Sequence, residues 1–235
     1  MSGILYLFPV TLAESPLEQV LPEYNRQLLM PIRHFIVEEV RTARRFLRKA
    51  DPHFDIDACQ FYALNKHTTP EQIASYLEAL ENGADMGLLS EAGCPAIADP
   101  GADIVRIAQE KGYKVVPLVG PSSILLALMA SGFNGQRFAF EGYLPVEKED
   151  RIKAIKRLEA RSYAEDMTQI FIETPYRNIK LLEDLSTNLR PQTRICVAFD
   201  ITGPEESIRT MTAKNWKNSS AELTKKPCIF LLYKA

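Results

Sequence analysis

The chain has 235 residues, of which 46% are hydrophobic and 25% charged, and its formal net charge is −2. This balance excludes a mainly disordered chain and allows one or two hydrophobic cores, while the near-neutral charge argues against a protein that coats nucleic acid non-specifically. No basic leader precedes the first short apolar run, and no apolar stretch approaches the roughly 20 residues that cross a bilayer, so we expect a cytoplasmic protein without a membrane segment.

Short apolar runs alternate along the chain with segments of helical periodicity. Several runs are continuously apolar, which is typical of strands covered on both faces. The expected strands fall in residues 4–10, 33–40, 86–90, 113–119, 137–144, 169–174, 194–201 and 228–234. The expected helices cover residues 17–29, 40–50, 70–82, 102–111, 122–131, 148–161 and 176–188. The alternation predicts an α/β chain.

Residues 117–121, "PLVGP", are the best candidate for a domain boundary, because two prolines and a glycine follow an apolar run there. We therefore predict an N-terminal α/β domain over residues 1–117 and a C-terminal α/β domain over residues 118–235. In the second domain the strands have fewer helices between them, and the chain around Gly203 and Pro204 has the pattern of a hairpin. A mixed sheet is expected there.

The loop "SEAGCPAIADPG", residues 90–101, follows an expected strand and has the composition of a ligand-binding turn. Gly93 permits close backbone approach, Pro95 stiffens the turn, and Asp99 and Pro100 predict a helix start with Asp99 as N-cap. Open α/β sheets bind ligands at the carboxyl ends of their strands. A plain connector that caps a helix is the alternative. A dinucleotide or P-loop phosphate site is not supported, because neither glycine pattern is present.

A second loop, "LVGPSSILLALMASG" at residues 118–132, predicts Pro121 as the first helical residue, with Ser122 and Ser123 in the first turn. Backbone N–H groups in a first turn have no partner within the helix, so they and the two hydroxyls could hold a polar group of a ligand. Ordinary capping by the serines is the alternative. The apolar stretch at residues 124–129 is expected in the core.

These two loops, together with "RFAFEGYLP" at residues 137–145 and "FIETPYR" at residues 171–177, closely resemble the tetrapyrrole methylase superfamily. Within it they resemble the bacterial 16S ribosomal RNA (cytidine-2'-O)-methyltransferases. That branch carries a Ser-Asp-Ala-Gly-x-Pro-x-Ile-x-Asp-Pro-Gly loop, a Pro-Gly-Pro-x-x helix start and a Tyr-Glu-Gly-Phe-Leu-Pro stretch. The matches are dense over residues 88–177.

The resemblance implies an S-adenosylmethionine (SAM) methyltransferase with two α/β domains, usually a homodimer, with the cofactor in the cleft between the domains. The matching positions imply that one loop contacts SAM and that a helix start binds it. The loop residues are Gly93, Cys94, Pro95 and Ile97, and the helix-start residues are Ser122 and Ser123.

Three segments depart from the pattern of this branch. Residues 8–16, "FPVTLAESP", contain no glycine where the branch has a Pro-x-x-Ile-Gly-Asn type loop on the substrate side. Residues 37–41, "VEEVR", stand in place of Ala-Glu-Asp-Thr-Arg, and residues 146–151, "VEKEDR", replace a lysine-rich stretch. The cofactor side therefore matches better than the substrate side.

A ribose 2'-hydroxyl is a poor nucleophile, so its methylation benefits from a general base. The candidates are Glu38 and Glu39, at the end of an expected strand, and Glu173 in "FIET". Glu38 is favoured because it aligns with the glutamate of the branch. The alternative for Glu38 and Glu39 is that they complement the dipole of the following helix.

Two helices are expected to carry basic faces that suit phosphate contacts. The first face consists of Arg41, Arg44, Arg45 and Arg48, without an interleaved acid. The second consists of Lys153, Lys156, Arg157 and Arg161. Solvated helix surfaces are the alternative for both.

Histidines and cysteines give no sign of a metal or redox site. The histidines are His34, His53 and His67, and they are dispersed in packing or surface positions. The cysteines are Cys59, Cys94, Cys196 and Cys228, and they are widely spaced. Neither a zinc site nor a disulfide framework is expected.

The first hypothesis is a metal-independent SAM methyltransferase that acts on ribosomal RNA, at the ribose 2'-O of a cytidine in the small subunit. One alternative is methylation of a tetrapyrrole or another small molecule, favoured if the basic faces lie far from the cleft. Another is a SAM-binding or RNA-binding protein without catalysis, suggested by the missing glycine loop. The sequence leaves the target nucleotide open.

Overall fold

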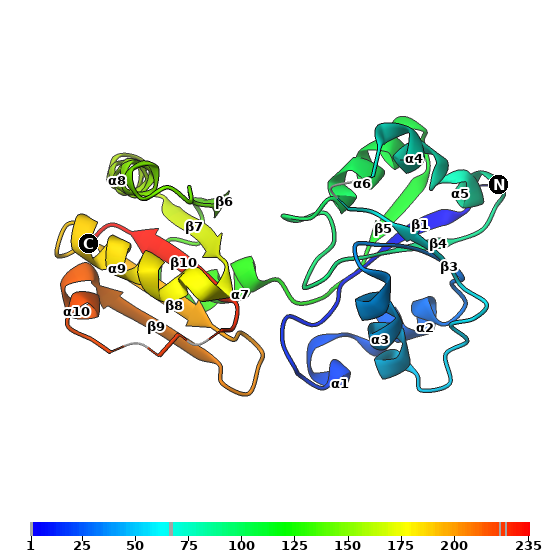
Figure 1. The fold of residues 1–235 in the computed structure, drawn as a ribbon, viewed down its shortest axis with the longest axis horizontal. Coiled ribbons are helices and arrows are strands. Elements are labelled where there is room, and N and C mark those ends of the chain that lie inside the picture. The colour runs from blue at the N-terminus through cyan, green and yellow to red at the C-terminus, as the bar shows by residue number, and fades with distance from the viewer. Residues whose placement is uncertain (1, 66–67, 221, 224) are drawn as a thin grey trace. The chain divides into compact units, whose positions relative to one another are not determined.

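The computed structural model describes residues 2–65, 68–220, 222–223 and 225–235, so His67 lies outside the described residues. The chain forms two compact units, Met1–Ser122 and Ser123–Ala235, each with its own five-stranded sheet (Figure 1). Both units combine a sheet with helices, which confirms the predicted two-domain α/β fold. The division falls close to the boundary predicted at residue 117. The cofactor cleft between the domains stays a prediction.

A parallel sheet forms the middle of the first unit. Its strands are β1 (Ile4–Phe8), β2 (His34–Val37), β3 (Gln60–Ala63), β4 (Met86–Leu89) and β5 (Lys114–Pro117), in the spatial order β3-β2-β4-β1-β5. All pairs are parallel, so all five strands end at the same edge of the sheet. Apolar side chains point to both faces: Ile36 belongs to one buried cluster, and its neighbours Phe35 and Val37 belong to another.

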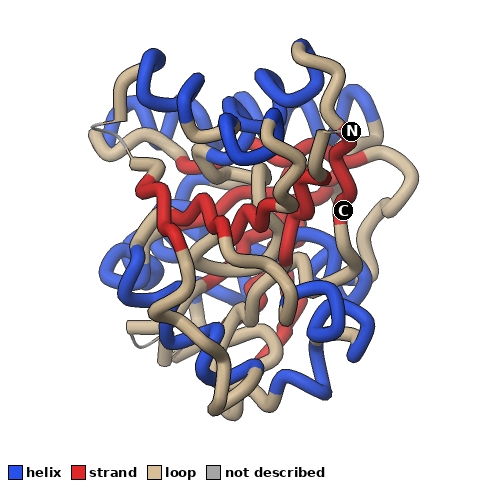
Figure 2. The backbone as a smooth tube through the Cα atoms, turned by 90° about the vertical axis from the view of Figure 1, so that its right-hand side faces the viewer, coloured by secondary structure: helices blue, strands red, loops and turns tan. Residues whose placement is uncertain are grey.

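Helices cover both faces of this sheet (Figures 1 and 2). The helices on one face are α1 (Leu17–Val20), α2 (Glu23–Leu29) and α3 (Val40–Ala50), and those on the other are α4 (Pro70–Ser75), α5 (Glu78–Glu81) and α6 (Gly101–Glu110). Leu47 of α3 packs in the cluster of Phe35, while Ile104 of α6 packs in the cluster of Ile36. The strands are therefore buried from both sides, as their continuous apolar runs predict.

The second unit contains a mixed sheet. Its strands are β6 (Phe138–Tyr143), β7 (Thr168–Glu173), β8 (Arg194–Phe199), β9 (Ser207–Thr212) and β10 (Cys228–Tyr233), in the order β6-β7-β10-β8-β9. Only the β6–β7 pair is parallel among these pairings, and β8 and β9 form an antiparallel hairpin. The predicted mixed sheet and hairpin are thus confirmed. The helical segments are α7 (Ser123–Ser131), α8 (Lys148–Glu165), a short 3-10 turn η1 (Pro175–Arg177), α9 (Asn178–Asn188) and α10 (Ala213–Lys217).

A buried ion pair fixes the "GYLP" segment that precedes α8. Nε and Nη2 of Arg151 donate to Oδ2 of Asp184 at 2.9 and 2.7 Å. Nη1 of the same guanidinium donates to the carbonyl oxygens of Pro145 and Val146 at 3.3 and 2.5 Å. One arginine therefore links α8, α9 and the end of the "GYLP" segment, and all three nitrogens of its buried guanidinium donate hydrogen bonds.

Several expectations for single elements were wrong. The helix expected over residues 17–29 is two helices, because Pro22 lacks an N–H and forces Leu21 into an extended conformation. The helix expected over residues 70–82 is also divided in two. The core expectation for residues 124–129 fails for Leu125 and Met129, which are 50% and 79% exposed. Helix α7 is apolar on both faces, and Ala127 and Leu128 are buried while these two are not.

Candidate active site

The carboxyl ends of four parallel strands bring the predicted functional segments of the first unit to one edge of the sheet. Val10 follows β1, Glu38 follows β2, the loop of residues 90–100 follows β4, and residues 118–121 follow β5. Strand β4 lies between β1 and β2, so the 90–100 loop is central at this edge. This is the edge at which open α/β sheets bind their ligands.

Gly93 ties the 90–100 loop to its neighbours. Its carbonyl oxygen accepts hydrogen bonds from the Val10 N–H at 3.0 Å and from the Ser90 hydroxyl at 3.0 Å. Its φ is +70°, and a Cβ at this position would lie 2.9 Å from Leu12 Cδ2 and 3.3 Å from the Pro121 carbonyl oxygen. The position therefore requires glycine for its backbone conformation and for the close approach of two other segments.

The same loop holds two further residues in the left-handed region, Ala96 with φ +65° and Ala98 with φ +55°. Such a conformation costs a non-glycine residue about 1–3 kcal/mol and persists only where the surroundings enforce it. Asp99 holds Ala96 in this conformation, because its Oδ1 accepts from the Ala96 N–H at 3.1 Å and from the Gly101 N–H at 2.7 Å. Burial raises the pKa of Asp99 against the lowering effect of these two hydrogen bonds. Hydrogen bonds within the chain therefore hold this part of the loop.

The first helical residues predicted from the two loops, Pro100 and Pro121, were placed too early. Helix α6 begins at Gly101 with Pro100 as its N-cap, and the carboxylate of Asp99 reaches the Gly101 N–H from one residue further out. Helix α7 begins at Ser123 rather than at Pro121. The reason is that residues 118–121 pack against the 90–100 loop within the first unit, where the Cys94 thiol donates to the Pro121 carbonyl oxygen at 3.5 Å.

The residues predicted to bind the cofactor differ in exposure. Gly93 and Pro95 are buried and Cys94 is half-buried, whereas the side chain of Ile97 is 55% exposed. Burial raises the pKa of the Cys94 thiol, so the thiol is protonated at neutral pH and is not a nucleophile. Ser122 is the last residue of the first unit and Ser123 the first of the second.

The structure separates the roles of Glu38 and Glu39. The Glu39 carboxylate is the N-cap of α3, where it accepts from the Arg41 N–H at 3.0 Å. Glu38 forms no hydrogen bond or ion pair with the described residues. Partial burial raises its pKa, and the negative charges of Asp99 and Glu91 raise it further. The helix-start interpretation thus applies to Glu39, and Glu38 remains available as a base.

Glu173 ends β7 in the second unit and is engaged. Its carboxylate is buried, and Oε1 accepts from Arg177 Nε at 3.0 Å, from Arg177 Nη2 at 2.5 Å and from the Thr174 N–H at 2.6 Å. These bonds hold the turn "TPYR" and pair the carboxylate with a guanidinium. The geometry favours Glu38 over Glu173 as general base.

The basic face of α3 begins at the same sheet edge as Glu38. Its arginines are exposed, and none forms an ion pair with a carboxylate of the described residues. Arg44 lies over the Phe61 ring at 5.4 Å and Arg48 donates to the Pro52 carbonyl oxygen at 2.8 Å. The guanidinium groups of Arg41 and Arg45 make no such contact with the described residues.

The basic cluster on α8 is partly neutralised. Lys153 pairs with Asp150 at 3.2 Å, and Arg161 pairs with Glu141 at 2.8 Å. The face on α3 therefore suits an anion better than the cluster on α8 does.

The described residues contain neither a cluster of metal ligands nor a membrane-spanning helix. No group of three or more His, Cys, Asp or Glu side chains among them is placed to hold a metal ion. No helix in this part of the chain is long and apolar enough to cross a membrane.

Relatives in sequence are ribosomal RNA methyltransferases by name. The Ribosomal RNA small subunit methyltransferase I of Haemophilus influenzae is 37% identical over 155 residues, which are 66% of this chain and 53% of that protein. The protein of the same name from Pseudomonas aeruginosa is 29% identical over 229 residues, which are 96% of this chain and 78% of that protein. The matched stretch thus spans about half the length of the first relative.

Solved structures of low sequence identity share the fold. The methyltransferase CobJ is 17% identical with a TM-score of 0.65, and the alignment covers 100% of this chain and 95% of that one. The uroporphyrin-III C-methyltransferase of Thermus thermophilus, complexed with S-adenosyl homocysteine, is 14% identical with a TM-score of 0.55, over 98% of this chain and 97% of that one.

The sequence pattern described as Tetrapyrrole (Corrin/Porphyrin) Methylases matches residues 15–216. This match spans both units and confirms the resemblance found in the two loops. The chain belongs to the tetrapyrrole (corrin/porphyrin) methylases.

Proposed function

We propose that the chain is a SAM-dependent methyltransferase that methylates the ribose 2'-O of a cytidine in small-subunit ribosomal RNA. Membership of a methylase family supports methyl transfer, and the names of the relatives in sequence support the RNA. The observation that carries the proposal is the meeting of the strained 90–100 loop and the unpaired carboxylate of Glu38 at one sheet edge. Transfer of a labelled methyl group from SAM to small ribosomal subunits tests it.

The 90–100 loop fits a cofactor with a polar end and an apolar-faced ring. The closely packed backbone around Gly93 presents peptide groups, and Ile97 offers an exposed apolar side chain to cover a ligand. We assign cofactor contacts to Gly93, Cys94, Pro95 and Ile97, with Ser122 and Ser123 at the start of α7. When bound, SAM supplies a methyl group on a sulfonium, which is already activated, so alignment and exclusion of water are the main tasks of the protein.

Glu38 is proposed to accept the proton of the ribose 2'-hydroxyl. Its carboxylate is unpaired among the described residues, and a raised pKa makes a carboxylate a stronger base near neutral pH. With SAM bound as methyl donor and released as S-adenosylhomocysteine, Glu38 would take the proton of the ribose hydroxyl and pass it to water. No metal takes part in this scheme.

The alternative substrate is a tetrapyrrole or another small molecule. The family description and the name of the uroporphyrin-III C-methyltransferase support this alternative. The basic face of α3 favours RNA, because it begins beside Glu38 and carries guanidinium groups without acidic partners in the described chain. A protein that methylates ribosomal RNA acts where ribosomes are, so we place it in the cytoplasm.

Removing two arginines from α3 is expected to weaken RNA binding and its salt dependence. We expect Arg41→Gln with Arg45→Gln to lower the slope of log affinity against log salt by about 0.7 for each lost phosphate contact, with SAM affinity unchanged. The control is Lys153→Gln with Lys156→Gln, which removes the same charge from α8. Fluorescence polarisation with single-stranded RNA across a salt series measures the RNA affinity and the salt slope of both double variants. A wild-type slope in the α3 double variant would make that face ordinary solvated surface.

We also propose a homodimer. The resemblance implies one, and the second unit exposes large apolar side chains, among them Met129 at 79% and Val146 at 66%. Light scattering at micromolar concentration is expected to give twice the chain mass of 26.5 kDa. A mass equal to that of one chain would contradict the proposal.

A further inference from the structure

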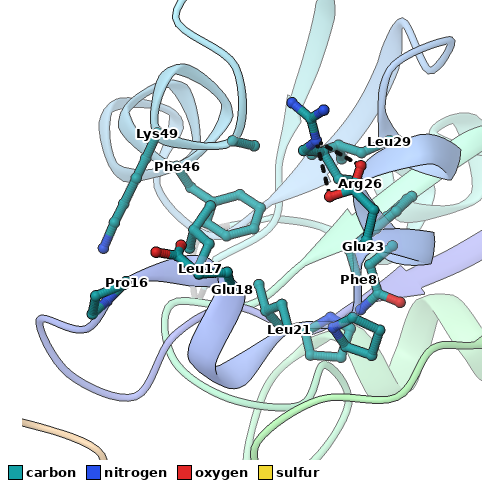
Figure 3. Close-up of a pocket in the computed structure, with 14 residues that line it drawn as sticks. Phe8, Pro16, Leu17, Glu18, Leu21, Glu23, Arg26, Leu29, Phe46 and Lys49 are labelled. Atoms are coloured by element: carbon teal, nitrogen blue, oxygen red, sulfur yellow. Dashed lines mark hydrogen bonds and ion pairs between the residues drawn. The ribbon is translucent and has the colours of Figure 1, made fainter.

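A cavity of about 500 Å³ lies in the first unit, among the end of β1, α1, α2 and α3 (Figure 3). This size is in the range of ligand pockets. Its walls are mostly apolar and include Phe8, Leu17, Leu21 and Phe46. In Figure 3 the Phe46 ring reaches from α3 toward α1, between Leu17 and the Glu23–Arg26 pair. One flat aromatic face and several aliphatic side chains suit a planar ring.

The charged side chains around the cavity leave one acceptor unused. Arg26 Nε is bound to Glu23 Oε1 at 3.0 Å. Lys49 Nζ donates to the Ser15 carbonyl oxygen at 2.7 Å, which ties α3 to the loop before α1. The carboxylate of Glu18 forms no hydrogen bond or ion pair with the described residues, although it lines the cavity. A ligand that donates hydrogen bonds from a planar edge matches this arrangement.

The cavity borders the candidate active site through shared residues. Pro9 lines the cavity, and a Cβ on Gly120 would lie 2.2 Å from its Cβ. Asn25, another lining residue, donates through Nδ2 to the Val119 carbonyl oxygen at 2.8 Å. One wall of the cavity is thus built on residues 118–121, the segment that also packs against Gly93.

The cavity also borders the basic face of α3. Lys49 lines the cavity and follows Arg45 of the basic face by four residues, so these two side chains lie on the same side of α3. A strand of RNA that follows the arginines would therefore pass the side of the cavity that α3 forms.

We propose that this cavity binds one unpaired nucleobase from the RNA strand held by α3, with an amino group at C4 of a pyrimidine or C6 of a purine, which means cytosine or adenine. The inference rests on the proposed RNA substrate. Phe46 and the aliphatic walls contact the faces of the base, as aromatic side chains do for unstacked bases. Glu18 accepts a hydrogen bond from the amino group, which uracil lacks, since uracil presents a carbonyl oxygen at that position. Glu18 is thus the residue that determines specificity.

The test compares three fluorescent single-stranded uridine decamers: one with a central cytidine, one with a central adenosine and one with uridine throughout. Because a good side-chain contact to a base edge discriminates by about 1–3 kcal/mol, we expect the wild-type protein to bind the first two about tenfold more tightly than the third. Glu18→Gln is expected to reduce this ratio to about one, because an amide can also donate to the uracil oxygen. The control Glu14→Gln changes an exposed acid outside the cavity and should keep the wild-type ratio.

Phe46→Leu is a second variant that keeps an apolar side chain. We expect it to weaken binding of the cytidine and adenosine decamers several-fold at an unchanged salt slope, because stacking is lost and phosphate contacts remain. A wild-type protein that does not distinguish the three decamers, or a Glu18→Gln variant that still does, would overturn the inference. Either result together with methyl transfer to ribosomal RNA leaves the proposed function intact. If the protein prefers the cytidine and adenosine decamers but neither binds SAM nor transfers methyl groups, the proposed function is rejected and the nucleobase pocket is supported.

Discussion

Replacing Glu38 with Gln is expected to lower kcat for methyl transfer by about 10²–10⁴-fold, with little change in SAM affinity. Glutamine has the size of glutamate but cannot take the proton of a ribose hydroxyl. Glu38 is exposed and unpaired in the described chain, so the substitution removes no contact that holds the fold. Single-turnover methyl transfer to small ribosomal subunits, with calorimetry of SAM binding, measures both quantities.

The matched control for this variant is Glu39→Gln. It removes the negative charge at the N-terminus of α3 but keeps an oxygen that can accept from the Arg41 N–H, so it is expected to cost about 0.3–1 kcal/mol of stability and to leave the chemical step nearly unchanged. A Glu38→Gln protein with activity within a few-fold of wild type would show that Glu38 is not the general base. Glu173 of the second unit would then be the remaining candidate.

The pH dependence of the methyl-transfer rate distinguishes a general base at Glu38 from a structural role, because only a base shifts the rate profile. A base must be ionised, so activity is lost as the pH falls through the raised pKa of Glu38. Glu91 contributes to that rise, so Glu91→Gln lowers the pKa of Glu38 and the acid limb of the rate profile should move to lower pH. A limb that stays in place would mean that another group limits the rate in acid.

Replacing Gly93 with Val is expected to weaken SAM binding by about 10–100-fold. A β-branched residue at φ +70° pays about 1–3 kcal/mol of strain, and its Cβ meets Leu12 and the Pro121 carbonyl oxygen, so the 90–100 loop must shift. The loop would then lose the backbone position at which the cofactor contacts are proposed. Isothermal titration calorimetry with SAM measures the loss.

Gly112→Val separates this effect from backbone strain in general. Gly112 has φ +73° with nothing within 4 Å of an added Cβ, and it precedes β5, at the opposite end of the sheet. This variant pays a similar conformational cost and should keep SAM affinity. Equal losses in both variants would mean that Gly93 acts only through stability.

The sequence predicts the fold well where local pattern and tertiary burial agree. Strand β4 is four continuously buried residues, and α3 has one apolar stripe, so both are recognised from periodicity. Strand β3 is not recognised from the sequence, because its residues are half-exposed at a sheet edge and its apolar run is short. The predicted burial of Met129 is wrong for the opposite reason. The apolar sequence of α7 predicts burial on both faces of the helix, but packing buries only one of them.

The candidate site is predicted only where the local sequence carries a signal. Loop composition and family resemblance point to residues 90–101 without any contact information. The difference between Glu38 and Glu39 depends on which side chain reaches the Arg41 N–H, and no pattern in "VEEVR" reveals this. The cavity beside Phe46 assembles side chains from a strand and three helices, so it exists only in the folded chain.

Methyl transfer to RNA tests the central claim most directly. Small ribosomal subunits from cells that lack the small-subunit methyltransferase I are incubated with the protein and SAM tritiated in the methyl group, and the RNA is then digested to nucleosides. We expect the label to migrate with a cytidine nucleoside methylated on the ribose 2'-oxygen, with fully methylated subunits accepting none. Label absent from RNA while calorimetry shows SAM bound, or label on a base instead of the ribose, would contradict the proposed function.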